Sequence, residues 1–361
     1  MIPREFFIEE RLEKYRFEAS CNLAESGFRN FTLGEVIERL GLSWSDLEKI
    51  SLADSPNCGS LELRKAIANL YSNVAPENVL VTTGTSEALY IFFRLLLKEG
   101  DIVSYLSPAF QALYEIPASL KAKLNPVVVH SNRIDVYSLF QQVAKLVILN
   151  HPHNPTGAVI YKEDIPKLKA IIQNWQGYVL FDEHYRFIDY NQSLGFSGAG
   201  LGKNVFATGS ITKSFGVTGL RIGWLIGEVE FLKKARAFKD YLTHTVNPIS
   251  EFLALKLIQN KESFLSYIKE NILKNLNIYN DIIPKLKSIK NFTPPLGGLV
   301  SFLELKSGIS SRQYADELYA NTGVFVLPGI DFEAEGFLRV GLGETHERFA
   351  SGLKKWLEWD K

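Results

Sequence analysis

The stretch Ser210–Gly223 constrains the fold and chemistry of this chain more than any other segment. It follows an apolar, strand-like run, which predicts that Lys213 lies just beyond the end of a β-strand. Ser210 and Thr212 precede this lysine, and Arg221 follows it. A lysine amine becomes a nucleophile when a desolvated, cationic neighbourhood lowers its pKa, and it then forms a Schiff base with an aldehyde. The two hydroxyls and the arginine indicate a phosphate site, so the stretch predicts a cofactor with both an aldehyde and a phosphate, namely pyridoxal 5′-phosphate (PLP).

The spacing of Lys213, Gly216, Gly219, Arg221 and Gly223 resembles the cofactor-lysine signature of class I/II aminotransferases of PLP fold type I. This resemblance implies an α/β protein with a mostly parallel sheet and crossover helices in a large domain. It also implies a smaller α+β domain, formed by the C-terminal third and the N-terminal segment. On this basis we expect an N-terminal segment at 1–45, a large PLP-binding domain at 46–260 and a small domain at 261–361.

The pattern of apolar runs agrees with such a sheet. Runs rich in apolar and β-branched residues alternate with helical patterns, which predicts strands joined by crossover helices. The predicted strands of the large domain are 79–84, 101–106, 144–150, 178–182 and 205–209. In the final third, strands are predicted at 298–303, 323–327 and 337–341 after a long helix.

An acidic residue, Asp182, ends the fourth of these strands, where open α/β sheets bind ligands. A carboxylate against the pyridine nitrogen keeps that nitrogen protonated and makes the ring an electron sink. The resemblance implies that Tyr185 and Asn154 bond the phenolic oxygen of the cofactor. Lys213, Asp182 and Tyr185 are therefore the predicted catalytic residues.

A glycine turn with hydroxyl residues, Thr85 and Ser86, leads from the first strand into a helix. Free backbone N–H groups at a helix N-terminus suit a phosphate, although Thr85 is also a common kind of helix cap. The resemblance favours the phosphate interpretation, and it implies that Phe110 stacks on the cofactor ring.

Substrate contacts are implied by the same resemblance. Ser26 and Gly27 lie in a turn-rich segment that closes over the substrate in fold type I enzymes, although the composition is equally typical of a surface loop. Arg339 lies on an apolar strand, where burial of a guanidinium is unfavourable unless it meets an anion. We expect Arg339, together with Asn154, to hold the α-carboxylate of an amino acid.

One position departs from the family pattern. Asp54 stands where many class I enzymes have a tyrosine that reaches the cofactor phosphate in the partner subunit. Either Asp54 turns away from that phosphate or it binds a positively charged group. Several segments further resemble capreomycidine synthase-like members, which cyclise a hydroxylated arginine: 25–27, 30–35, 86–90, 153–155 and 240–243.

The sequence therefore predicts a PLP-dependent aminotransferase that acts on an L-amino acid and a 2-oxo acid through a Lys213 Schiff base. The alternative within the family is elimination and cyclisation of a hydroxylated arginine. The sequence also allows a serine acyl-transfer enzyme, because Ser210-x-x-Lys213 and Lys306-Ser307-Gly308 mimic two motifs of that class. A non-catalytic sensor with the aminotransferase fold is allowed as well.

Composition limits the partners of the 361-residue chain. Forty basic residues balance forty acidic ones, which gives no reason to expect a nucleic acid or a membrane surface as a partner. Two cysteines cannot form a disulfide framework, and no metal site is predicted. Without an apolar leader or membrane-length run, the sequence predicts a cytoplasmic enzyme, and the resemblance implies a homodimer with shared active sites.

Overall fold

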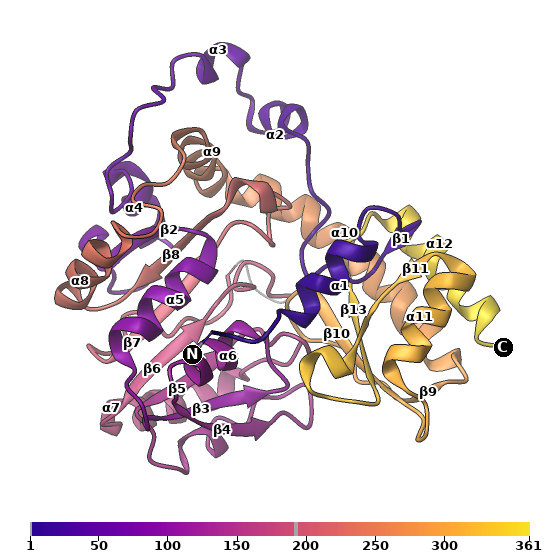
Figure 1. Ribbon diagram of the computed structural model, residues 1–361. Coiled ribbons are helices and arrows are strands. Elements are labelled where there is room, and N and C mark those ends of the chain that lie inside the picture. The colour runs from indigo at the N-terminus through magenta and orange to yellow at the C-terminus, as the bar shows by residue number, and fades with distance from the viewer. Residues whose placement is uncertain (1, 191–193) are drawn as a thin grey trace.

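The computed structural model describes residues 2–190 and 194–361, which form a larger lobe around one sheet and a smaller lobe next to it (Figure 1). The C-terminus lies in the smaller lobe, and the N-terminus lies against the larger one. The α/β architecture predicted from the sequence is confirmed.

The sheet of the larger lobe has seven strands in the order β2-β8-β7-β6-β5-β3-β4. Their bounds are β2 (Val79–Thr83), β3 (Ile102–Ser107), β4 (Lys123–Val128), β5 (Leu146–Asn150), β6 (Tyr178–Asp182), β7 (Val205–Ser210) and β8 (Ile222–Ile226). All neighbours are parallel except β8, which is antiparallel to both β2 and β7. The five predicted strands are confirmed, whereas β4 and β8 were not predicted.

Both faces of this sheet are buried at its central strands β5 and β6, which explains why these strands are continuously apolar. Within β5, Val147 belongs to the apolar cluster on one face and Ile148 to the cluster on the other. Within β6, Phe181 belongs to the first of these clusters and Leu180 to the second. The surrounding helices are α4 (Leu61–Ala68), α5 (Gly84–Leu96), α6 (Ala112–Ser119), α7 (Ile165–Asn174), α8 (Val229–Lys239) and α9 (Pro248–Gln259).

The smaller lobe contains an antiparallel sheet in the order β12-β13-β10-β9. Its elements are β9 (Ile289–Asn291), β10 (Val300–Leu305), β12 (Leu327–Pro328) and β13 (Phe337–Gly341), with helices α10 (Lys261–Ile282), α11 (Ser311–Thr322) and α12 (His346–Trp359). A further strand from the N-terminal segment, β1 (Cys21–Asn22), pairs in parallel with β11 (Val324–Phe325). The N-terminal segment therefore contributes to the smaller lobe, while the exact domain bounds stay a prediction.

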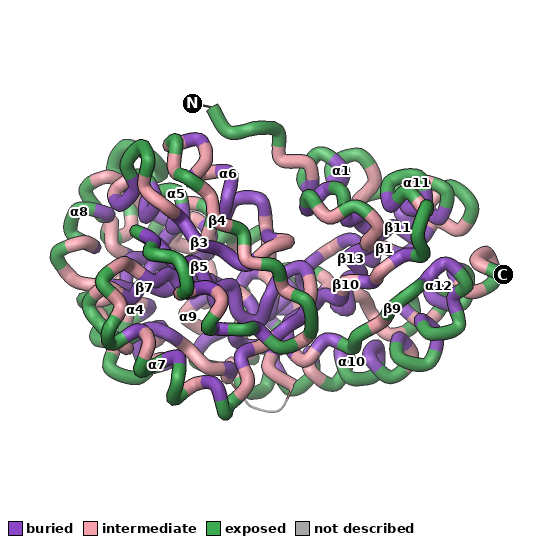
Figure 2. The backbone as a smooth tube through the Cα atoms, turned by 90° about the horizontal axis from the view of Figure 1, so that it is seen from below, coloured by how far each residue is buried: buried purple, intermediate pink, exposed green. Residues whose placement is uncertain are grey.

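The first residues of the chain bridge the two lobes, as Figure 2 shows. Arg4 pairs with Glu115 of α6 at 2.8 Å, on the larger lobe. Helix α1 (Phe7–Tyr15) then buries Ile8 and Leu12 in a cluster with apolar side chains of the smaller lobe. The sequence analysis predicted no element here, because a short amphipathic helix without a capping side chain gives a weak signal. Helices α2 (Leu33–Leu40) and α3 (Trp44–Leu47) follow it.

Short 3-10 turns complete the described structure: η1 (Pro76–Asn78), η2 (Ser138–Phe140), η3 (Lys162–Asp164), η4 (Thr218–Leu220), η5 (Ile283–Lys285) and η6 (Gly329–Phe332). Among the residues that the structure describes, no helix combines the length and apolarity needed to cross a membrane.

Candidate active site

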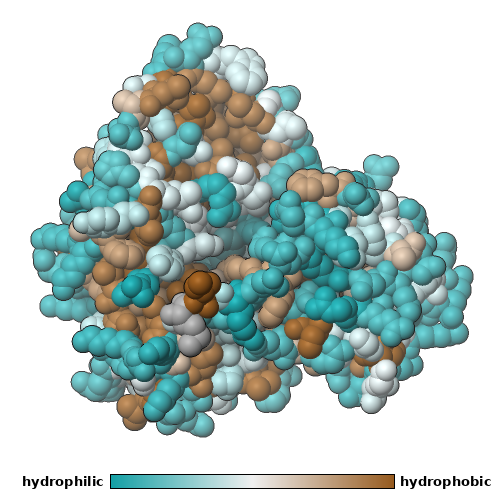
Figure 3. All heavy atoms as spheres, in the orientation of Figure 1, coloured by the Kyte–Doolittle hydropathy of each residue, from teal (hydrophilic) through white to brown (hydrophobic). Residues whose placement is uncertain are grey.

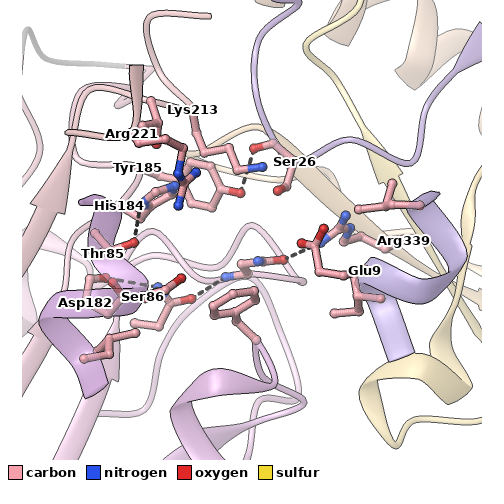
Figure 4. A pocket seen from close by; sticks show the side chains of 18 residues that line it. Glu9, Ser26, Thr85, Ser86, Asp182, His184, Tyr185, Lys213, Arg221 and Arg339 are labelled. Atoms are coloured by element: carbon pink, nitrogen blue, oxygen red, sulfur yellow. Dashed lines mark hydrogen bonds between the residues drawn. The ribbon is translucent and has the colours of Figure 1, made fainter. Parts of the chain in front are cut away.

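A cavity between the two lobes brings together most of the predicted site residues (Figure 4). The carboxyl ends of β5, β6 and β7 face it from the larger lobe, as expected for a ligand site in a parallel sheet. Eleven predicted residues line it: Ser26, Thr85, Ser86, Phe110, Asn154, Asp182, Tyr185, Thr212, Lys213, Arg221 and Arg339. Ser210, Gly27 and Asp54 do not line it.

Lys213 lies beyond the end of β7, as the sequence predicted, and its amine enters the cavity. Burial lowers the pKa of Lys213, because a desolvated amine favours its neutral form. Glu25 acts in the opposite direction, with a carboxylate oxygen 3.9 Å from Nζ. The amine is therefore poised to act as a nucleophile and to accept a proton.

Asp182 lies at the end of β6 and is 5% exposed. Its carboxylate accepts hydrogen bonds from Asn150 Nδ2 at 3.0 Å and Thr208 Oγ1 at 2.8 Å. Burial raises the pKa of Asp182 to about 6, although both hydrogen bonds favour the charged form. Asp182 is thus a fixed, buried acid that a cationic ring nitrogen would stabilise in its ionised form.

The N-terminus of α5 forms the end of the cavity that suits a phosphate. The helix has no side-chain cap, and Thr85 lies within its first turn, so the alternative of an ordinary cap is wrong for Thr85. Gly84 has a φ of +77°, and a Cβ there would lie 2.5 Å from Nη2 of Arg221. Glycine therefore allows Arg221 to approach the helix terminus, an arrangement in which backbone N–H groups and the guanidinium are suited to bind one anion.

The hydroxyl groups of Ser210 and Thr212 lie close together near this end of the cavity. Ser210 Oγ lies 2.9 Å from Thr212 Oγ1 and 3.1 Å from Nδ1 of His184. Burial, together with Lys213 and Arg221, lowers the pKa of His184 to about 3, so the imidazole is neutral. Although Ser210 does not line the cavity, its hydroxyl orients two groups that do.

Arg339 enters the cavity from β13 of the smaller lobe and is 1% exposed. Its guanidinium donates to Asn154 Oδ1 at 3.2 Å and to the Ala24 carbonyl at 2.5 Å, whereas its Nε has no partner in the described structure. A buried guanidinium with spare donors is suited to bind a carboxylate.

Tyr185 and the 26–27 turn lie on the Lys213 side of the cavity (Figure 4). The Tyr185 hydroxyl donates to the Ser26 carbonyl at 2.7 Å. Gly27 packs closely against the side chain of Lys213, since a Cβ at position 27 would lie 3.0 Å from Lys213 Cδ. The predicted bond from Tyr185 to the cofactor stays a prediction.

Asp54 lies outside this cavity and is exposed. It accepts a hydrogen bond from Thr245 Oγ1 at 3.2 Å, which links its loop to the segment after α8. Within one subunit, the structure does not bring Asp54 to the predicted substrate residues, so its role stays a prediction.

The sequence analysis missed several residues that line the cavity: Ile8, Glu9, Leu12, Leu89, Asn150 and His184. The positions of Asn150 and His184 in the sequence could have indicated that they line the cavity. Asn150 ends β5, and His184 follows Asp182 by two residues. Nothing local in the sequence placed α1 over the cavity. Its position depends on packing against the smaller lobe.

The acyl-transfer hypothesis lacks geometric support. Residues 306–308, which supplied its second motif, line a surface pocket with Lys290 and Phe337. They do not contribute to the cavity that holds Lys213.

The donor set fits PLP. The unpartnered Nε of Arg339, the buried carboxylate of Asp182 and the close approach of Arg221 to Gly84 each match a group that the cofactor or its substrate carries. The residues that would hold the cofactor are Thr85, Ser86, Phe110, Asn154, Asp182, Tyr185, Ser210, Thr212, Lys213 and Arg221.

Comparison with known proteins agrees with this donor set. The family model described as aminotransferase class I and II matches residues 22–355. Capreomycidine synthase of Streptomyces vinaceus is 25% identical over 355 residues, which cover 96% of this chain and 91% of that protein. Aspartate aminotransferase of Pyrococcus horikoshii is 27% identical over 330 residues, covering 85% of this chain and 83% of that protein.

Solved structures resemble the whole chain. A PLP-dependent aminotransferase from Streptococcus suis has a TM-score of 0.91 at 25% identity, with 99% of this chain and 98% of that chain covered. The PLP-dependent cyclase OrfR has a TM-score of 0.93 at 23% identity, with 100% and 98% covered, which indicates a shared fold.

Proposed function

Because the chain belongs to the class I and II aminotransferase family, whose members use PLP, we propose that it transfers the α-amino group of an L-amino acid to a 2-oxo acid. The observation that carries the proposal is the convergence on one cavity of Lys213, the buried acid Asp182 and the buried guanidinium of Arg339. Lys213 follows β7, Asp182 ends β6 and Arg339 lies in β13, and each has a different proposed role.

When bound, PLP supplies an aldehyde that captures an amino group and a ring that accepts electron density from the substrate carbon. Arg221, with Thr85, Ser86, Ser210 and Thr212, would hold the phosphate. The Asp182 carboxylate would pair with the ring nitrogen and keep it protonated.

Arg339 and Asn154 orient the substrate by its α-carboxylate. This fixes the Cα–H bond relative to Nζ of Lys213, so proton removal becomes an intramolecular step. Nζ removes the α-proton and later returns a proton, which a lowered pKa favours because the neutral amine is the base. Both lobes and α1 contribute residues to the lining of the cavity.

A second reaction has specific support. Capreomycidine synthase resembles the chain over a larger share of its length than the aspartate aminotransferase does, 96% against 85%. The alternative function is therefore elimination and ring closure on a hydroxylated arginine, in which Nζ of Lys213 would still remove the α-proton.

A single-turnover experiment separates the two reactions. Holoenzyme is mixed with an amino acid donor in the absence of an acceptor, and the products are identified by mass spectrometry. Transamination predicts about one equivalent of 2-oxo acid per active site. Release of a cyclised amino acid from 3-hydroxyarginine, with no 2-oxo acid, would support the alternative instead.

The Lys213→Ala variant is the control for this experiment. It should form neither product, since both reactions need the amine and the base. Full activity of this variant would refute both proposals.

A further inference from the structure

Helix α1 places one carboxylate in the wall of the cavity. Glu9 lines the cavity between Ile8 and Leu12, which are buried, and it lies on the same side as Arg339 (Figure 4). This wall therefore offers an apolar surface and one negative charge beside the predicted α-carboxylate site. It is suited to a side chain with an aliphatic stem and a cationic end.

The charges around Glu9 are not balanced. Arg16 is shared between two carboxylates, with Nη2 3.4 Å from Glu9 and Nε 3.1 Å from Glu25. Lys213, 3.9 Å from Glu25, is another cation of this group, and its amine is committed to the cofactor and the substrate. Arg339 also interacts with Glu9 and Glu25, and its guanidinium is assigned to the substrate α-carboxylate. With Lys213 and Arg339 both assigned to ligands, Arg16 is the cation that remains for the two carboxylates in the described structure, which leaves a net negative charge at the rim.

The cations of the cavity point to the same substrate class. Within the described residues, those that line it are Lys213, Arg221 and Arg339. Each has a proposed partner already: the amino group, the phosphate and the α-carboxylate, respectively. The described residues that line the cavity thus offer no further cation for an acidic side chain, whereas they include Glu9 for a basic one.

We propose that the Glu9 carboxylate selects amino acids whose side chain ends in an ammonium or a guanidinium group. This inference rests on the proposed binding of an amino acid to the cavity and names the class of its side chain. The aliphatic stem lies along Ile8 and Leu12, and the cation pairs with Glu9. The first residue of α1, Phe7, donates its backbone N–H to Gln111 of the larger lobe at 3.0 Å, and Ile8 and Leu12 pack on the smaller lobe. The contact with Glu9 therefore connects side-chain recognition to a helix that contacts both lobes.

The test compares arginine with citrulline, which has nearly the same shape without the charge. Steady-state kcat/KM is measured for holoenzyme with each amino acid, and Kd is measured through the visible absorption of the bound cofactor. The wild type should prefer arginine. In Glu9→Gln the preference should fall roughly threefold to fivefold, through KM for arginine, while the values for citrulline stay within about twofold.

Glu10→Gln is the matched control, because it removes the same charge from the next, exposed position of α1 outside the cavity. It should keep the wild-type preference. Glu9→Lys should reverse the selection and favour glutamate over glutamine, which a merely structural role of Glu9 would not produce.

Three outcomes would overturn the inference. One is equal use of arginine and citrulline by the wild type. Another is an equal change for both amino acids in Glu9→Gln, which would mean that Glu9 only competes with the substrate for Arg339. The third is an unchanged preference in Glu9→Gln. By contrast, a holoenzyme that converts no amino acid at all would refute the proposed function itself.

Discussion

The guanidinium of Arg339 donates to Oδ1 of Asn154 at 3.2 Å, although 185 positions separate the two residues in the sequence. Asn154 follows β5 in the larger lobe, and Arg339 lies in β13 of the smaller lobe. The contact joins the two lobes across the cavity, which both residues line, at the site proposed for the substrate carboxylate.

Replacing Arg339 by lysine should weaken substrate binding more than it slows the chemistry. Lysine keeps the charge but loses the planar, two-pronged geometry. We expect KM for the amino acid to rise roughly tenfold to a hundredfold with a smaller change in kcat. The corresponding amine without a carboxylate is the control ligand, and a parallel loss of its binding would argue against the assignment.

Gly27→Ala should slow turnover without releasing the cofactor. A Cβ at Gly27 would lie 3.0 Å from Lys213 Cδ, so the side chain that carries the reactive amine must move by a few tenths of an ångström. We expect kcat to fall about tenfold, because small displacements of a catalytic base have large effects on rate. Gly34→Ala is the matched control, since its nearest neighbour would be 3.9 Å away. Equal activity of both variants would contradict this prediction.

Cofactor binding should depend on the ionisation of Asp182. Burial raises the pKa of Asp182 to about 6, so the group is a carboxylate above that pH and a neutral acid below it. We expect cofactor affinity, measured by equilibrium dialysis, to fall as the pH drops below about 6. Asp182→Asn should bind roughly a hundredfold more weakly at pH 8 and lose this pH dependence. An Asn variant with the wild-type profile would exclude Asp182 as the counter-ion.

Arg221→Gln should discriminate between PLP and pyridoxal, which lacks the phosphate. Loss of the guanidinium beside the α5 terminus should reduce the affinity for PLP roughly tenfold or more and leave that for pyridoxal unchanged. Both affinities are measured from the visible absorption of titrated apoprotein. Equal losses for the two ligands would indicate a general disturbance of the site instead.

The predicted homodimer has a candidate surface. Leu52 is 77% exposed and Tyr241 is 87% exposed, and their two loops are joined by the bond between Asp54 and Thr245. Figure 3 also shows apolar side chains gathered over the part of the larger lobe that carries α3 and α9 in Figure 1. Sedimentation analysis should find a dimer that the double variant Leu52→Glu, Tyr241→Glu dissociates.

Val143→Glu serves as the control for that variant, because Val143 is 85% exposed in a different loop. A monomeric wild type, or dissociation by both variants alike, would refute this assignment of the interface.

The sequence determined the larger lobe and most of the cofactor end of the site. Its predicted strands are continuous apolar runs, which can be recognised from a short stretch of sequence. The residues at or just beyond their carboxyl ends, such as Asp182 and Lys213, meet because neighbouring parallel strands end together. Thr85 and Arg221 were predicted from two separate local patterns, a glycine turn at the start of a helix and the motif around Lys213. In contrast, β4 was missed because polar residues of this edge strand, including Lys123 and Asn125, break the apolar pattern.

Only the tertiary structure decided how the substrate side of the cavity is built. Glu9 reaches the cavity because α1 packs Ile8 and Leu12 on the smaller lobe while Arg4 anchors the preceding residues to the larger one. These contacts join segments more than a hundred positions apart, and no local pattern encodes them. The sequence alone thus specifies the chemistry of the cofactor site, whereas the long-range packing of α1 decides which charges surround the substrate.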